Sequence, residues 1–291
     1  MATVPNKKNA PVKSRPTGLL TWIVVGVVVI AVAGFVVAKV ATSTKAGSSS
    51  AISATMAAEI GQLPASLYDT VGINSPSIPV TPPTLAKNQP LLSATSASGV
   101  KLPQVVYYGA EYCPFCAAQR WAAILALSRF GTFTGLRTSF SSPTDVYPNT
   151  PTFTFVHSTY SSKYLVFTSV ETQDVNRKSL QTPTKLENYL LSKYDVAPYF
   201  PSQSASSLSI PFMDFGNQFL TSGASFNPGV LAGQTREQIA AGLKSPSSPI
   251  TQAIVAAANF QTAAICKLTG NKPGNVCNAS GVKAAARKLS I

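Results

Sequence analysis

Residues 105–121 read VVYYGAEYCPFCAAQRW, and this stretch decides the fold of the chain. It opens with four apolar residues in a row, which is typical of a buried strand. After Gly109 come two cysteines separated by two residues, Cys113 and Cys116, and then a run of residues that favour helix. The stretch therefore predicts a strand, a short loop that carries two cysteines, and a helix that begins between them.

The expected helix start gives the first cysteine a reactive environment. Pro114 lies where proline is favoured, at the first position of the helix, because its missing N–H would have no partner there. Cys113 is then the N-cap residue, beside the unpaired amides and the positive end of the helix dipole. This environment lowers the pKa of a thiol and favours the reactive thiolate. Cys116 follows one turn later on the same face, so the spacing predicts a dithiol that can close as a disulfide.

Half of a zinc site and a chance spacing compete with this interpretation of the cysteine pair. A structural zinc ion takes four ligands, usually from two closely spaced pairs. The remaining cysteines, Cys266 and Cys277, have ten residues between them, too many for a closely spaced zinc-binding pair, and the chain has one histidine, His157. His157 has no Cys, Asp or Glu close to it, so we expect it on a strand face. We therefore expect a redox dithiol with no metal and no cofactor.

The segment GAEYCPFC resembles the active-site loop of the thioredoxin superfamily. The aromatic residue just before the first cysteine is part of this resemblance, and the Pro-Phe pair between the cysteines resembles that of glutaredoxin-like and Dsb-like proteins. Over roughly residues 63–277 the chain also resembles an uncharacterised family of membrane-anchored, thioredoxin-like proteins, domain of unknown function 929. In thioredoxin a buried carboxylate stands six residues before the first cysteine, and this position here is Tyr107. The usual proton acceptor is therefore absent.

A second informative stretch, residues 208–243, begins as a strand that contains Pro211 and ends in a capped helix. This order resembles the second half of a thioredoxin-like domain, in which a cis proline lies against the Cys-x-x-Cys pair. Ile210-Pro211 is the match, and Thr150-Pro151 competes with it. The resemblance implies a substrate groove shaped by Ile210, Pro211, Tyr112, Pro114 and Phe115. The choice of Pro211 makes residues 141–207 an insertion of mixed hairpin and helix.

Three more elements are predicted between these two stretches. Residues 133–140 read as the next strand. Residues 152–157 and 164–170 alternate between apolar and polar side chains and predict a hairpin. A capping box at residues 184–187 opens a helix.

The N-terminal region predicts a membrane anchor. Residues 16–38 carry no charge and are long enough to cross a bilayer as a helix. A secretory signal peptide has a shorter apolar core of about 7–15 residues, so we expect an uncleaved anchor at residues 19–40. Four basic residues precede the span and two follow it, which favours a cytoplasmic N-terminus. We expect a single-pass protein of the cell membrane with an extracytoplasmic main domain.

The net charge of +13 does not mark a nucleic-acid-binding face. Residues 1–45 and 264–291 hold basic residues and no acidic ones, so the excess charge belongs to the two ends. The expected segments are a basic cytoplasmic tail (1–18), the anchor (19–40), a Ser/Thr/Pro-rich tether and packing arm (41–90), an α/β thioredoxin-like domain (91–281) with its insertion, and a basic C-terminal tail (282–291).

The second cysteine pair has two interpretations. Four cysteines suit an oxidising compartment, where a bridge between Cys266 and Cys277 would be a structural disulfide. It would close a loop of about 12 residues and contribute roughly 3 kcal/mol in the chain-entropy model. The alternative is a second redox pair that relays electrons to or from Cys113 and Cys116.

The sequence as a whole predicts an enzyme, a membrane-anchored protein thiol:disulfide oxidoreductase. Cys113 would form the mixed disulfide with a substrate protein and Cys116 would resolve it. The direction, oxidase or reductase, stays open because it depends on the environment of the Cys113 sulfur. An oxidase would need a membrane redox partner, for which a quinone-coupled protein resembling vitamin K epoxide reductase is an analogy. The alternative function is a non-catalytic thioredoxin-like binding or assembly protein of the cell envelope.

Overall fold

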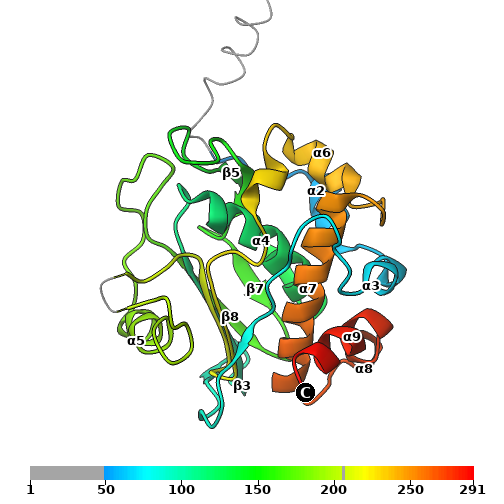
Figure 1. The fold of residues 1–291 in the computed structure, drawn as a ribbon. Coiled ribbons are helices and arrows are strands. Elements are labelled where there is room, and N and C mark those ends of the chain that lie inside the picture. The colour runs from blue at the N-terminus through cyan, green and yellow to red at the C-terminus, as the bar shows by residue number, and fades with distance from the viewer. Residues whose placement is uncertain (1–48, 205–206) are drawn as a thin grey trace, which may run out of the picture. The chain divides into compact units, whose positions relative to one another are not determined.

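A mixed β-sheet is the framework of the computed structural model, which describes residues 49–204 and 207–291 (Figure 1). Its central strand, β3 (Lys101–Gly109), contains the predicted apolar run. β8 (Val166–Glu171) pairs with β3 in parallel, and β9 (Phe212–Phe215) pairs with it antiparallel on the other edge. The sheet continues through β10 (Phe219–Ser222) and β1 (Thr84–Leu85), and β2 (Ser93–Thr95) pairs with the beginning of β3. The chain has the predicted α/β class of fold.

Helices cover both faces of this sheet. They are α4 (Pro114–Leu127) and α7 (Pro249–Leu268) on one face and α5 (Lys185–Tyr194) on the other (Figure 1). Successive side chains of a strand point to opposite faces, so Val105 and Tyr107 pack in the core with α4 and α7. Val106, between them, packs with Leu190 of α5. Burial on both faces explains why the strand is apolar without alternation.

The helix α7 is buried along almost its whole length and packs against α4. Pro249 stands at its first position, as Pro114 does in α4. Both helices are rich in alanine, which has the highest helix propensity and lets helices approach closely. These two helices are therefore the centre of the larger core.

The arm before the sheet packs on this core. It forms α2 (Ala54–Gly61) and α3 (Ala65–Val71), separated at Pro64, the N-cap of α3. Its buried residues are Met56, Ile60, Leu67, Tyr68 and Val71. Of the tether and arm expected at 41–90, the described part is thus a packed element rather than a free linker, and even its proline-rich end contributes β1 to the sheet.

The expected strand at 133–140 is two strands, β4 (Thr132–Thr134) and β5 (Arg137–Phe140). Gly135 between them has a φ of +77°, a conformation that interrupts a strand and that glycine adopts at little cost. β4 pairs with β7 (Thr159–Ser161), and β5 pairs with β6 (Pro151–Thr154).

The expected hairpin and insertion are corrected by the same pairings. Residues 152–157 and 164–170 do not pair with each other, because β6 joins β5 and β8 joins β3. Alternation of apolar and polar residues identifies a strand but not its partner. The segment 141–207 is therefore not an insertion, since it supplies β8 to the main sheet and α5 to its second face. The excursion from the sheet is shorter and lies between α4 and β8.

The C-terminal part adds short helices around α7. They are η1 (Pro228–Leu231), α6 (Arg236–Gly242), α8 (Gly274–Cys277) and α9 (Ser280–Lys288). The helix α9 buries Val282 and Ala285 in the main core, and its C-cap residue Leu289 is buried there too. The expected boundary between domain and basic tail at 281 and 282 thus falls inside a packed helix.

The expected cytoplasmic tail (1–18) and anchor (19–40) lie outside the described residues. Within residues 49–204 and 207–291, no helix combines the length and the apolar character that a membrane crossing requires.

A buried carboxylate on β9 predicts a pH-dependent stability. Burial raises the pKa of Asp214 to about 7, while one of its oxygens accepts the N–H of Asn217 and the other has no partner among the described residues. The folded state therefore holds a proton that the unfolded state has lost above about pH 4. The free energy of unfolding should fall by ~2–4 kcal/mol as the pH rises from 4 to 8.

Urea unfolding of Asp214→Asn measures this contribution, because the neutral side chain removes it. The variant should lose most of the decline between pH 4 and pH 8. An unchanged decline in the variant would mean that other groups cause it.

Candidate active site

The two cysteines of residues 105–121 lie at the beginning of α4. Cys113 is the N-cap residue, as predicted, and its Sγ accepts the N–H of Cys116 at 3.4 Å. The thiol of Cys113 lies 3.8 Å from the carbonyl oxygen of Ile210. Both thiols are free, with Cys113 6% exposed and Cys116 0%. Only Cys113 can be reached from solvent.

The environments of the two thiols separate their pKa values. Hydrogen bonding with the Cys116 thiol lowers the pKa of Cys113, and backbone N–H groups at the start of α4 and the charge of Arg120 act in the same direction against burial. Burial raises the pKa of Cys116 well above its usual range. Cys113 is thus the sulfur that ionises first, and Cys116 keeps its proton.

Ile210 and Pro211 lie beside this dithiol, joined by a cis peptide bond just before β9. The competing Pro151 opens β6 instead, where its carbonyl accepts the indole N–H of Trp121 at 3.0 Å. Of the two prolines considered from the sequence, Pro211 is the one next to Cys113.

The other residues expected to shape a substrate groove, Phe115, Tyr112 and Pro114, differ in exposure and in contacts. Phe115 is 39% exposed, and its ring meets the edge of Tyr147 with 6.0 Å between centroids. Tyr112 is partly buried beneath the guanidinium of Arg177, 3.9 Å from the ring centroid. Pro114 is buried and shapes the helix start rather than a surface. The rim of the site therefore consists of aromatic side chains from the loop and from the excursion between α4 and β8.

A buried ion pair next to the dithiol was not predicted from the sequence. Arg120 Nε and Nη2 donate to the two carboxylate oxygens of Glu171 at 2.8 and 2.7 Å, and Nη2 also donates to the carbonyl of Ala110 at 2.7 Å. Both side chains are 0% exposed. Part of the signal was present, since Arg120 interrupts an apolar helix four residues after Cys116.

Tyr107, six residues before Cys113, lies on β3. It is fully buried, burial raises the pKa of its hydroxyl well above the usual range, and the Cys116 thiol adds to this effect. The hydroxyl oxygen lies beside Gly109 and close to the Cys116 thiol. A side chain at Gly109 would come within 2.4 Å of this oxygen, so glycine is required there for Tyr107 to lie flat against the strand end.

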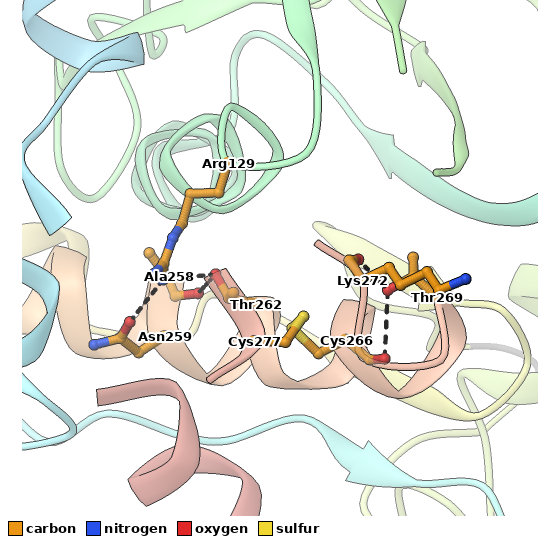
Figure 2. Close-up of a disulfide and its surroundings, with 8 residues drawn as sticks. All are labelled: Arg129, Ala258, Asn259, Thr262, Cys266, Thr269, Lys272 and Cys277. Carbon is orange, nitrogen blue, oxygen red and sulfur yellow. Dashed lines mark hydrogen bonds between the residues drawn. A yellow bond between two sulfur atoms is a disulfide. The ribbon is translucent and has the colours of Figure 1, made fainter. Parts of the chain in front are cut away.

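Cys266 and Cys277 form a disulfide that ties the end of α7 to α8 (Figure 2). The turn between them is held by Thr269, whose hydroxyl donates to the carbonyl of Lys272 at 2.6 Å. Figure 2 also shows Arg129, after α4, reaching Asn259 of α7 at 3.1 Å. The disulfide therefore fixes α8 to the end of α7, and α7 is also bound by Arg129, which follows α4.

The disulfide and the dithiol lie at opposite ends of β9. Cys113 contacts Ile210, which precedes the strand, whereas Leu268 next to the disulfide packs against Gly216, which follows it. Four strand residues span ~13 Å. Direct exchange between the two pairs is impossible over this distance in the folded chain, which favours the structural interpretation over the relay.

Replacement of Cys266 and Cys277 by alanine should lower the free energy of unfolding by ~3 kcal/mol. The loop that the bridge closes is short, so the unfolded chain loses limited freedom from it. Urea denaturation of the oxidised protein and the double variant measures the difference. A change below about 1 kcal/mol would show that turn contacts hold the segment without the bridge.

The described residues contain no group of three or more His, Cys, Asp and Glu side chains able to hold a metal ion.

The expected position of His157 on a strand face is wrong. His157 lies in the turn after β6, with a φ of +62°. A cavity of about 210 Å³ beside the site is lined by His157, Glu111 and Asp174 among others.

Residues 92–267 match the family described as "Domain of unknown function (DUF929)". This match covers more than half of the 291 residues, and the chain belongs to that family. Membership was predicted from the sequence, and the family description assigns no activity. No curated protein and no solved structure is significantly similar to the chain.

Proposed function

We propose that this protein is a thioredoxin-like thiol:disulfide oxidoreductase that acts on other proteins through Cys113 and Cys116. The observation that carries the proposal is the asymmetry of the pair. Cys113 is the partly accessible N-cap thiol with a lowered pKa, and Cys116 is buried with a raised one. One sulfur that reacts and one that resolves are what disulfide exchange requires.

The order of elements supports the same assignment. A parallel strand–helix–strand unit (β3, α4, β8) is followed by an antiparallel pair (β9, β10) and the long helix α7. This order is similar to that of a thioredoxin-like domain. The position of Ile210 and Pro211 against Cys113 agrees with the substrate groove of such proteins.

In the oxidising direction, a substrate thiolate attacks Cys113 Sγ and the bond between Cys113 and Cys116 breaks. Cys116 leaves as a thiolate and takes up a proton, and the substrate is held as a mixed disulfide. A second substrate thiolate then attacks the substrate sulfur and releases Cys113 as a thiolate. Two electrons pass to the dithiol and the substrate gains a disulfide. A reductase runs the same steps backwards.

The proposed location is the outer side of the cell membrane, with residues 19–40 as the anchor. The Cys266–Cys277 bridge supports an oxidising compartment. An oxidase there would have to pass its electrons on, and a quinone-coupled membrane protein is the kind of partner that could accept them. No cofactor of its own enters the proposed steps.

Trapping of the mixed disulfide tests the proposal. The full chain in detergent, reduced and carrying Cys116→Ala, should form a covalent adduct with insulin that dithiothreitol releases. Its Cys113 thiolate attacks a disulfide of insulin and no second thiol resolves the product. Cys113→Ala should form no adduct. An absence of adduct with both variants would support the alternative, a binding or assembly protein without exchange activity.

A glutathione titration of the wild-type dithiol then gives its direction. A reduction potential near −120 mV would place it with strong oxidants, and one near −270 mV with reductases.

A further inference from the structure

The ion pair of Arg120 and Glu171 has no obvious structural need for charge. Both side chains are completely buried, and the third guanidinium nitrogen, Nη1, has no hydrogen-bond partner among the described residues. A buried ion pair is often no more stabilising than apolar residues of similar volume, because both charges lose their hydration. Its burial in the core therefore points to a role beyond packing.

The place of the pair in the fold suggests that role. Arg120 lies one helical turn after Cys116 on α4, and Glu171 is the last residue of β8, which runs parallel to β3. By donating to the Ala110 carbonyl as well, Arg120 joins α4 and β8 to the loop that leads into Cys113. Three segments that position the dithiol thus meet at one guanidinium.

We propose that Arg120 and Glu171 are positioning residues for the dithiol, Arg120 holding the loop before Cys113 and supplying positive charge beneath the sulfurs, and Glu171 limiting that charge. This inference rests on the proposed function, in which Cys113 reacts as a thiolate. Neither residue has to touch the substrate.

The sign of the effect follows from the charges. Arg120 lowers the pKa of both thiols, and Glu171 raises that of Cys116. Neutralisation of Glu171 leaves an uncompensated positive charge, which stabilises the Cys113 thiolate. Neutralisation of Arg120 does the opposite. A stabilised thiolate favours the reduced dithiol and makes its disulfide more oxidising.

Several other titratable groups lie around the ion pair, on the elements that pack against it. They are Tyr107 from β3, Glu111 from the loop before α4, Cys116 of α4 and its N-cap residue Cys113. The pKa of the Tyr107 hydroxyl is raised far from neutral pH, and Glu111, nearly buried, lies close enough to raise the pKa of Glu171. Because several titratable groups lie close together, the ionisation of the Cys113 thiol should be measured by the reaction of that sulfur itself.

Alkylation of the reduced full chain by iodoacetamide, followed at the Cys113 peptide by mass spectrometry between pH 4 and 9, tests the inference. Glu171→Gln should lower the midpoint of the pH profile by ~1 unit, and Arg120→Gln should raise it by a similar amount. The double variant carries neither charge of the pair and should have a midpoint above that of the wild type, because Arg120 acts on the Cys113 thiol.

The control is Glu59→Gln, which makes the same change of charge in a more exposed pair formed by other elements, α2 and the turn after α6. Glu59 accepts from Lys244 at 2.9 Å, with two thirds of the lysine side chain exposed. This variant should leave the midpoint unchanged, because water screens exposed charges. If one of the single variants fails to fold, the midpoint of the double variant still tests the inference. Midpoints of all variants within about 0.3 unit of the wild type would overturn the inference.

This experiment needs no substrate, so its failure differs from failure of the proposed function. Shifted midpoints without any insulin adduct would leave the charge effect standing and remove the enzymatic role. Adducts formed by Cys113 together with unshifted midpoints would remove only the inference.

Discussion

Replacement of Cys113 by serine should reduce disulfide exchange to the uncatalysed rate, a loss of at least about a thousandfold. Serine has nearly the shape of cysteine but no ionisable thiol at neutral pH, and the buried Cys116 cannot reach a substrate in its place. Insulin reduction and oxidative refolding of a reduced protein, both with the full chain, measure the effect in the two directions.

Cys116→Ser is the matched variant. It retains the reactive thiol and should start the reaction but release product slowly, because no second thiol resolves the mixed disulfide. Equal exchange rates for wild type and Cys113→Ser would refute the enzymatic proposal and leave the non-catalytic scaffold.

Removal of one member of the buried ion pair should cost ~3–5 kcal/mol of unfolding free energy. Glu171→Leu leaves the guanidinium of Arg120 charged, buried and without its two carboxylate contacts. Arg120→Met leaves Glu171 buried, and its pKa, which burial already raises, should rise further. Urea denaturation followed by tryptophan fluorescence gives the free energies of both variants.

The double variant Arg120→Met/Glu171→Leu should recover most of this loss, since apolar residues of similar volume replace buried pairs at little cost. The exposed pair of Lys244 and Glu59, 2.9 Å apart, is the control, and its removal should change stability by less than about 1 kcal/mol. Losses in the two single variants that add up in the double one would contradict the coupling.

Local signals in the sequence predicted the strand, the loop and the helix start that position the two cysteines. The proline after Cys113 and the apolar strand before it are short-range patterns, and they correctly gave the helix start and the N-cap. The proline next to the site, Pro211, came from a resemblance in the order of elements rather than from a local pattern.

Non-local features were harder to obtain. The partners of β6 and β8 depend on which edges the rest of the chain leaves free, and strand periodicity contains no information on that. The meeting of Arg120 and Glu171 results from the parallel pairing of β3 with β8. A charge inside an apolar helix was visible in the sequence, but its partner depended on a pairing that was predicted differently.

Both ends of the described chain pack on α7, so the unit that folds is longer than the segment that matches the family. The family match spans residues 92–267 and so leaves out α3 and α9, which bury Tyr68 and Val282 in the core with α7. It also ends between Cys266 and its partner Cys277. A fragment cut at the family limits would expose apolar helix surface and an unpaired thiol, and we expect it to aggregate. Expression of this domain therefore needs limits near residues 49 and 291, well outside those of the family.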